Sequence, residues 1–152
     1  MSANPRPSIH IATARAADID EIDELERRCF PNPWLRDFFE SELRGSGRYS
    51  LVARKDGRIA GYVFAMWFFD EMHVNKIAVD ERERRQGIAL ALMGECLRFA
   101  KANRIKTISL EVRKSNQGAQ DFYSILDFEV SYTRPRYYPD GEAAVVMVRQ
   151  IS

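Results

Sequence analysis

The amino-acid sequence predicts a mixed α/β (α+β) fold, with one sheet packed against helices. Two apolar patterns indicate it: alternation at every second residue, typical of strands, and repetition every three to four residues, typical of helices. In chain order the segments read βααβββαβαββ, which is not the regular βαβ array of a doubly wound sheet. The 152 residues suit one domain, which we place at residues 8–151, with residues 1–7 as a flexible lead.

Strands dominate the first half of the chain. Pro31 and Pro33 end the first helix, because proline lacks the N–H that a helix interior requires. Asp56-Gly57 is a turn signal typical of a hairpin, so the strands on either side of it are expected to pair. The predicted elements of this half are a strand at 8–13, helices at 16–29 and 34–43, and strands at 49–54, 58–68 and 71–79.

Helices and strands alternate in the second half, before two closing strands. Ile88, Leu92 and Cys96 lie at helical spacing on the longer helix, and Ala119 and Tyr123 do so on the shorter one. We expect these faces to be buried. The predicted elements are a helix at 87–101, a strand at 105–112, a helix at 116–126 and strands at 128–132 and 143–149.

Charge and hydropathy exclude several classes of partner. Lys and Arg number 23 against 22 Asp and Glu, a net charge of +1, so no overall field attracts nucleic acid or an anionic membrane. The longest apolar run, at 59–69, is broken by Gly61 and is too short to span a bilayer. Cys29 and Cys96 lack metal-ligand or CxxC spacing, which is typical of reduced thiols. We therefore expect a cytoplasmic protein without a metal, as a monomer or weak dimer.

The most informative motif is the turn RRQGIA at residues 84–89, between a predicted strand and a predicted helix. The unpaired N–H groups at such a helix start form an anion site, most often for phosphate. GxxxxGK[ST] is absent, which excludes a Walker nucleotide loop, and GxGxxG is absent, which disfavours a dinucleotide fold. The remaining pattern is [RQ]-x-x-G-x-[GA], met by Arg84, Gly87 and Ala89.

Further motifs accompany this turn. They are NKIAVD at 75–80, LEVRKSN at 110–116, DFYSILDF at 121–128 and RYYPDGE at 136–142. Together they resemble the GNAT superfamily of acetyl-coenzyme A dependent N-acetyltransferases, over nearly the whole chain. Within that superfamily they are similar to the RimI group, which acetylates an N-terminal alanine of a ribosomal protein, and to archaeal N-terminal acetyltransferases.

The resemblance implies a mostly antiparallel sheet of six to seven strands with about four helices, in which a splayed parallel strand pair holds acetyl-CoA. The pantetheine arm would bond the strand of Ile77, Ala78 and Val79 as an added strand would. Asn116 either bonds the pantetheine or caps the helix that it begins. Gly87 suits the turn, because a Cβ there would hold the phosphate away from the backbone. Arg84 and Arg85 would add charge for the phosphates, or else are solvated surface arginines. The residues implied to seat the pyrophosphate are Arg85, Gln86, Gly87, Ile88, Ala89 and Leu90.

Moving an acetyl group from sulfur to an amine needs a base for the amine proton and an acid for the thiolate. The resemblance assigns the base to Glu111, acting through water, and the acid to Tyr123, for which core packing is the alternative. A carboxylate has a reference pKa of about 4.3, so burial or a water relay has to make Glu111 effective. An α-amine, at roughly 7.7–8.0, loses its proton more readily than a lysine at about 10.4, which favours an N-terminal acceptor.

Acceptor contacts are expected from Trp34, Glu71, Tyr137 and Tyr138. Glu71 would bind the acceptor amine, with a surface carboxylate as the alternative. The two tyrosines would clamp the acceptor peptide, or else pack on their own loop. His73 is a second candidate base, with a partly buried strand position as the alternative.

Two positions depart from the RimI-like pattern. Asp127 occupies a site after a helix where glycine is usual, and we expect a positive φ there, which Asp tolerates better than most residues. Ala143 replaces an acidic residue that many members carry, so acceptor recognition is expected to differ.

The sequence thus predicts an acetyl-CoA dependent enzyme that acetylates a protein N-terminus, with an alanine-starting small-subunit ribosomal protein as the first candidate acceptor. Acetylation of a lysine or a small amine is one alternative. Binding of acetyl-CoA without transfer, as a sensor, is another. Binding of nucleic acid through the basic turn is disfavoured, because no aromatic residues are interleaved for base stacking.

Overall fold

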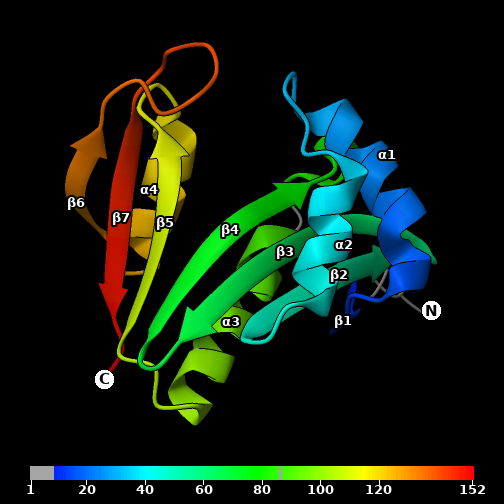
Figure 1. Ribbon diagram of the computed structural model, residues 1–152, viewed down its shortest axis with the longest axis horizontal. Helices are drawn as coiled ribbons and strands as arrows, with labels where there is room; N and C mark the ends of the chain where they lie inside the picture. The colour runs from blue at the N-terminus through cyan, green and yellow to red at the C-terminus, as the bar shows by residue number, and fades with distance from the viewer. Residues whose placement is uncertain (1–8, 86) are drawn as a thin grey trace, which may run out of the picture. The chain divides into compact units, whose positions relative to one another are not determined.

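The computed structural model describes residues 9–85 and 87–152, so Gln86, Ser8 and the expected lead at 1–7 lie outside the described residues. In the described part of the chain, seven strands form one sheet in the order β1-β2-β3-β4-β5-β7-β6 (Figure 1). This mostly antiparallel sheet with four described α-helices confirms the predicted fold class. The elements are β1 (Ile9–Thr13), η1 (Ala16–Asp18), α1 (Ile19–Cys29), α2 (Arg36–Arg44), β2 (Arg48–Lys55), β3 (Arg58–Phe68), β4 (Glu71–Val79), η2 (Glu81–Glu83), α3 (Ile88–Ala102), β5 (Thr107–Arg113), α4 (Gln117–Ile125), β6 (Glu129–Arg134) and β7 (Ala144–Gln150).

The chain divides into two compact units. The first comprises Met1–Phe64 and Lys76–Cys96, and the second comprises Ala65–Asn75 and Leu97–Ser152. β3, β4 and α3 each have residues in both units. The expectation of a single domain over residues 8–151 stays a prediction.

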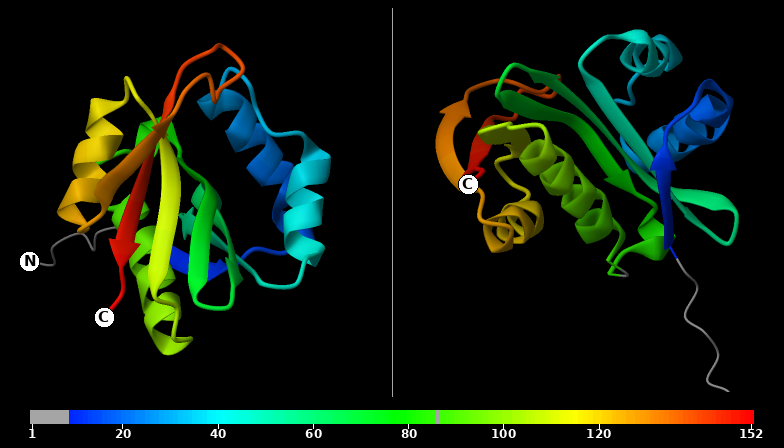
Figure 2. Two further views of the ribbon diagram at one scale, coloured as in Figure 1. Left: turned by 60° about the vertical axis from the view of Figure 1, so that its left-hand side comes forward. Right: turned by 90° about the horizontal axis from the view of Figure 1, so that it is seen from below.

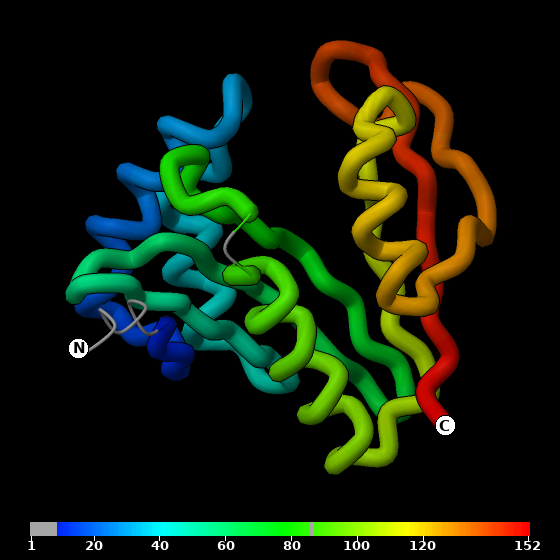
Figure 3. Tube along the Cα trace, turned by 180° about the vertical axis from the view of Figure 1, so that it is seen from behind, coloured from blue at the N-terminus to red at the C-terminus, as the bar shows by residue number. Residues whose placement is uncertain are grey.

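In the first unit, α1 and α2 lie on one face of β2 and β3, and the first turns of α3 lie on the other face (Figures 1 and 3). The apolar spacing along α1 turns one stripe of side chains toward the strands. Removing these side chains from water is the main force that holds the layer together. The centre of this core consists of Ile22, Leu25, Phe39, Tyr62 and Phe64.

Glycine shapes the first unit at two places. The turn between β2 and β3 has a positive φ at both Asp56 (52°) and Gly57 (78°), the geometry of a tight hairpin, which confirms the predicted turn. A Cβ on Gly61 would lie 2.8 Å from the carbonyl oxygen of Ala78 and 3.0 Å from the side chain of Ile88. Glycine at position 61 therefore lets β3 approach β4 and the start of α3.

In the second unit, β4 and β5 are parallel, with a register that runs from Glu71↔Thr107 to Val74↔Leu110. This confirms the expected parallel pair. β5 then pairs antiparallel with β7, and β7 with β6 at the edge of the sheet. α4 covers one face of β5 and β7 (Figures 2 and 3).

Element boundaries shift where local backbone geometry interrupts a pattern. The helix expected from residue 34 begins at Arg36, because Leu35 is extended with a ψ of 151°. The strand expected from residue 105 begins at Thr107, after Arg104 takes a φ of 58°. The helix expected from residue 16 opens as a 3-10 turn over Ala16–Asp18. No helix among the described residues combines the length and the apolar character needed to cross a membrane.

Candidate active site

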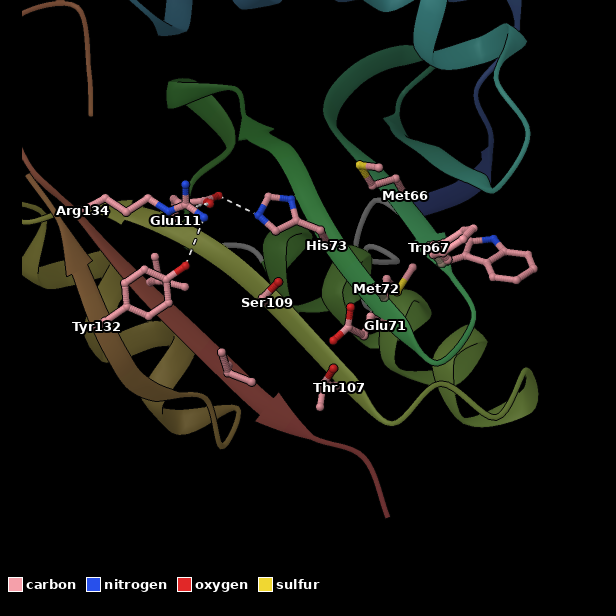
Figure 4. A pocket seen from close by; sticks show the side chains of 13 residues that line it. Met66, Trp67, Glu71, Met72, His73, Thr107, Ser109, Glu111, Tyr132 and Arg134 are labelled. Atoms are coloured by element: carbon pink, nitrogen blue, oxygen red, sulfur yellow. Dashed lines mark hydrogen bonds and ion pairs between the residues drawn. The ribbon is translucent and has the colours of Figure 1, made fainter. Parts of the chain in front are cut away.

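A cavity of about 390 Å³ lies on the sheet of the second unit (Figure 4). Its walls come from the end of β3 and from β4, β5, β6 and β7. In the parallel register His73 lies opposite Ser109, and Glu111 follows two residues further along β5. Because side chains alternate along a strand, Ser109 and Glu111 share one face. The register therefore places two titratable side chains, His73 and Glu111, in one cavity.

His73 and Glu111 form a hydrogen-bonded pair (Figure 4). Nε2 of His73 lies 2.7 Å from a carboxylate oxygen of Glu111, and Nδ1 lies 2.8 Å from Oδ1 of Asn75. The imidazole is thus held at both nitrogens. His73 is a partly buried residue of β4, as the alternative expected, and it also contacts Glu111; its role as a base stays a prediction.

The pair shifts the pKa values of its two members in opposite directions. Burial lowers the pKa of His73, but the hydrogen bonds to Glu111 and Asn75 raise it by more, so it lies above its usual value. Burial raises the pKa of Glu111, but the hydrogen bond and charge of His73 lower it by more. Burial therefore does not raise the pKa of Glu111 above its usual value, as was expected of an effective base. The two groups titrate as a coupled pair, and both shifts favour the charged form of the side chain concerned.

β6 adds a cation beside Glu111. The guanidinium of Arg134 lies 3.9 Å from the second carboxylate oxygen of Glu111 and donates a hydrogen bond of 3.0 Å to the hydroxyl of Tyr132. Both Arg134 and Tyr132 line the cavity (Figure 4). Glu71 lines it too, but at the opposite end from Glu111, beside Thr107. The geometry therefore disfavours binding of one acceptor amine by both Glu71 and Glu111.

Tyr123, the expected acid, is a buried residue of α4, with 6% of its surface exposed. Its ring packs edge-to-face against Phe122 and Phe128, with centroids 5.1 and 5.7 Å away. It is not among the residues that line the cavity of Figure 4. The structure thus shows the packing role that the sequence left open, while the role as acid stays a prediction.

The loop between β6 and β7 is held by charge. Arg113, at the end of β5, bonds Asp140 at 2.8 Å and Glu142 at 2.9 Å. Its guanidinium also lies 4.1 Å from the ring centre of Tyr138. Tyr137 and Tyr138 pack edge-to-face with centroids 5.0 Å apart, so they do pack on their own loop. Their role as an acceptor clamp stays a prediction.

The basic turn belongs to the first unit. Arg85 and Gly87 both have a positive φ, of 65° and 78°, on either side of Gln86, which lies outside the described residues. A Cβ added to Gly87 would meet no atom within 4 Å, so the backbone there is open to a ligand. Arg84 and Arg85 are exposed. Ile88 is buried and begins α3, so only its backbone N–H is available to an anion.

The segment before α2 is held by a buried ion pair in the first unit. Glu26, with none of its surface exposed, accepts hydrogen bonds from the backbone N–H of Trp34 at 2.8 Å and from Nζ of Lys76 at 2.9 Å. The hydroxyl of Tyr62 donates to its other oxygen. Nζ of Lys76 also lies 3.9 Å from the ring centre of Phe30 and 5.0 Å from that of Trp34. Trp34 is therefore fixed at its backbone and at its ring.

Several smaller expectations have a clear outcome. Asn116 caps α4, because its side chain accepts a hydrogen bond from the N–H of Ala119; a bond to pantetheine stays a prediction. Asp127 has a φ of 67°, which confirms the expected positive φ. Both cysteines are free, and burial raises the pKa of Cys96 to about 12. Cys29 is half-buried, and its Sγ lies 3.7 Å from the carbonyl oxygen of Val79 in β4.

Sequence reasoning missed Arg134, Tyr132 and the buried pair of Glu26 with Lys76. β6 is exposed along its whole length and carries no motif, so nothing in the sequence marks Arg134 as a neighbour of Glu111. A signal did exist for His73. Glu71 and His73 alternate along one predicted strand, as Ser109 and Glu111 do along another, and a parallel pairing of these strands brings the two faces together.

Comparison with known proteins identifies the class of this enzyme. The model of the acetyltransferase (GNAT) family matches residues 19–128. A putative [ribosomal protein bS18]-alanine N-acetyltransferase of Bacillus subtilis (strain 168) is 33% identical over 139 residues, which span 90% of this chain and 92% of the relative. An N-alpha-acetyltransferase of Sulfurisphaera tokodaii is 33% identical over 150 residues, 90% of each chain.

The solved structures agree. The crystal structure of the ribosomal-protein-S18-alanine N-acetyltransferase from Escherichia coli matches with a TM-score of 0.90 at 30% identity, over 95% of each chain. The chain belongs to the GNAT acetyltransferase family. Within that family it is an N-acetyltransferase of the type to which the ribosomal-protein-alanine and N-alpha-acetyltransferases belong.

Proposed function

We propose that this protein transfers the acetyl group of acetyl-CoA to the N-terminal α-amine of a protein. The first candidate acceptor is a small-subunit ribosomal protein that begins with alanine, and the cytoplasm is the proposed place of reaction. The observation that carries the proposal is the Glu111–His73 pair in the wall of an open cavity. Two similar proteins are named as a putative [ribosomal protein bS18]-alanine N-acetyltransferase and an N-alpha-acetyltransferase, which supports the proposal.

The donor is assigned to the basic turn. Acetyl-CoA supplies an acetyl thioester when bound. The open backbone at Gly87, the positive φ of the turn and the first N–H groups of α3 suit its pyrophosphate. Ile77, Ala78 and Val79 would bond the pantetheine, with Asn116. The proposed pyrophosphate seat is Arg84, Arg85, Gln86, Gly87, Ile88, Ala89 and Leu90.

Glu111 and His73 act as one base. The amine proton passes through a water to the carboxylate of Glu111 and comes to rest on the imidazole, because His73 is the more basic member of the pair. The pair therefore binds a proton more tightly than a lone carboxylate does, and its proton affinity is closer to that of an α-amine. This brings the base near its working pH, where general-base catalysis is most efficient.

Tyr123 is the proposed acid. A neutral phenol with a reference pKa of about 10 can give a proton to a departing thiolate and recover it from solvent. Trp34, Tyr137 and Tyr138 are proposed to contact the acceptor peptide. The anchoring of Trp34 by Glu26, and of the tyrosine loop by Arg113, supports this, since a preorganised contact loses less entropy on binding.

The test is acetylation of two synthetic peptides, read by mass spectrometry. One begins with a free alanine; the other has the same sequence with a blocked N-terminus and an internal lysine. We expect acetylation of the first alone. Glu111→Gln should lower its rate by about 10²- to 10⁴-fold, and Tyr123→Phe by a similar order, with unchanged circular dichroism. Glu129→Gln, an exposed carboxylate that does not line the cavity, is the matched control.

Each alternative predicts a different result. Preference for the blocked peptide would overturn the N-terminal proposal in favour of lysine acetylation. Acetyl-CoA binding by calorimetry, without turnover on any peptide, would indicate a sensor. Full activity in both variants would refute the acid–base assignment and leave the family assignment untouched.

A further inference from the structure

The cavity that contains Glu111 extends well beyond the reacting groups. Figure 4 shows Glu111 and Arg134 at one end and Glu71 and Thr107 at the other. Thr107 and Glu111 are four residues apart on β5, a separation of about 13 Å at roughly 3.3 Å per residue. An extended acceptor peptide advances at the same rate, so its third to fifth residues can reach the far end when its amine is near Glu111.

The far end carries the carboxylate of Glu71, while the neighbouring cation Lys106 pairs with Asp70 at 3.8 Å. Glu71 is exposed, and its carboxylate has no hydrogen-bond or ion-pair partner among residues 9–85 and 87–152. The carboxylate of Glu111 at the near end is instead bonded to His73 and faced by Arg134. The cavity is therefore polarised along its length, with a cation beside the reaction centre and a free anion about four residues away.

An exposed aromatic surface adjoins that anion. Phe68, which lines the cavity, is 70% exposed, and Phe69 is 78% exposed. Their rings pack edge-to-face with centroids 4.3 Å apart. Phe69 has a φ of 53°, a conformation that costs a bulky residue about 1–2 kcal/mol. Its exposed ring contributes no core packing that would offset this cost. Two aromatic rings in water beside a free carboxylate form a surface that is more useful to a ligand than to the fold.

We propose that Phe68 and Glu71 bind a cationic side chain, Arg or Lys, at the third to fifth residue of the acceptor. A guanidinium stacks on an aromatic face and pairs with a carboxylate at the same time, and an ammonium can do both more weakly. Arg134 disfavours a cation next to the acceptor amine, so the preference depends on position. This inference rests on the proposed N-terminal acetylation and specifies the class of acceptor.

The experiment is a positional scan with eight-residue peptides that begin with alanine. All other positions are serine or glycine, except for one arginine that is moved from position 2 to position 7. We expect kcat/KM to peak with arginine at positions 3–5, about five- to tenfold above the peptide without arginine, through KM and not through kcat. The peak should shrink as salt is raised from 50 to 500 mM.

Charge reversal at position 71 provides the decisive variant. Glu71→Lys should abolish the arginine peak and create one for glutamate at the same positions, and Phe68→Ser should reduce the arginine peak without reversing it. Glu129→Lys makes the same change in net charge outside the cavity and should leave the peak in place. A flat scan, or a peak that survives Glu71→Lys, overturns the inference. Peptides acetylated equally at every arginine position would refute this subsite alone, whereas no N-terminal acetylation of any peptide would refute the proposed function.

Discussion

Replacing Lys76 by methionine should destabilise the protein more than any exposed substitution. Glu26 has no exposed surface, and only 14% of the Lys76 side chain is exposed, so the ion pair is shielded from water. Methionine keeps the length of the side chain and removes its charge. The carboxylate of Glu26 is then left buried with two neutral donors, the hydroxyl of Tyr62 and the N–H of Trp34.

The size of the effect follows from the burial. Removing one partner of a buried pair costs about 3–5 kcal/mol, because the other charge remains without compensation. The two remaining donors favour the lower end, so we expect a loss of about 3 kcal/mol in the free energy of unfolding. For a domain of this size that corresponds to a fall in Tm of roughly 6–12 °C. Burial and then Glu26 raise the pKa of Tyr62, so its hydroxyl keeps the proton that it donates.

Urea unfolding of four proteins measures the coupling: the wild type, Lys76→Met, Glu26→Gln and the double variant. A glutamine at position 26 can accept from the N–H of Trp34 without burying a charge. The double variant should therefore be more stable than Lys76→Met alone. The reasoning is refuted if Lys76→Met costs less than about 1 kcal/mol, or if the two single effects add in the double variant.

Four further predictions test the site and its supports. The Glu111–His73 pair contributes most to stability between about pH 4.5 and 6.5. The pKa of His73 is raised, so its contribution is lost as the pH rises through that pKa. The pKa of Glu111 is lowered, so its contribution is lost as the pH falls through that pKa. Catalysis requires that both the acceptor amine and the Glu111–His73 pair lose a proton, so a plot of log(kcat/KM) against pH should rise with a slope of about 2 at low pH. His73→Gln should reduce that slope to about 1. An unchanged slope would contradict a base shared by the two residues. Gly61→Ala should cost about 1–3 kcal/mol, since its Cβ meets a backbone oxygen at 2.8 Å, whereas Gly94→Ala, which meets nothing within 4 Å, should cost no stability in urea unfolding. Arg113→Gln should raise KM for the acceptor several-fold through the loop that it anchors while KM for acetyl-CoA stays constant; an equal rise in both would count against a positioning role.

The fold was predictable to the extent that its signals are local. Asp56-Gly57 marks the hairpin because the φ angles of a tight turn suit few other residues, and the bounds of β3 and β4 follow from apolar patterns and turn residues. The spacing along α3 identified Ile88, Leu92 and Cys96 as core residues. Leu35 was missed as a helix boundary, because its extended backbone follows Trp34, whose N–H is bonded to Glu26 of α1, and its own propensity does not mark it.

The candidate site was predictable only in its parts. Glu111 and the basic turn were identified from motifs, and His73 was noted but given a minor role. The pairing of His73 with Glu111, the approach of Arg134 and the free charge of Glu71 depend on strand register and on which strand lies at the edge of the sheet. Register is a property of strands far apart in the chain, and no local pattern encodes it.

By itself the sequence determined the order of the elements, the basic turn and the family, because each is written in residues that are neighbours along the chain. Only the tertiary structure decided the surroundings of Glu111, the proposed base. A lone carboxylate is a weak base for an amine, and burial was expected to correct this. The fold instead places an imidazole 2.7 Å from Glu111, which lowers the pKa of the carboxylate and raises that of the histidine. The interaction exists because residues 38 positions apart meet across two parallel strands, a distance in sequence that only long-range packing can close.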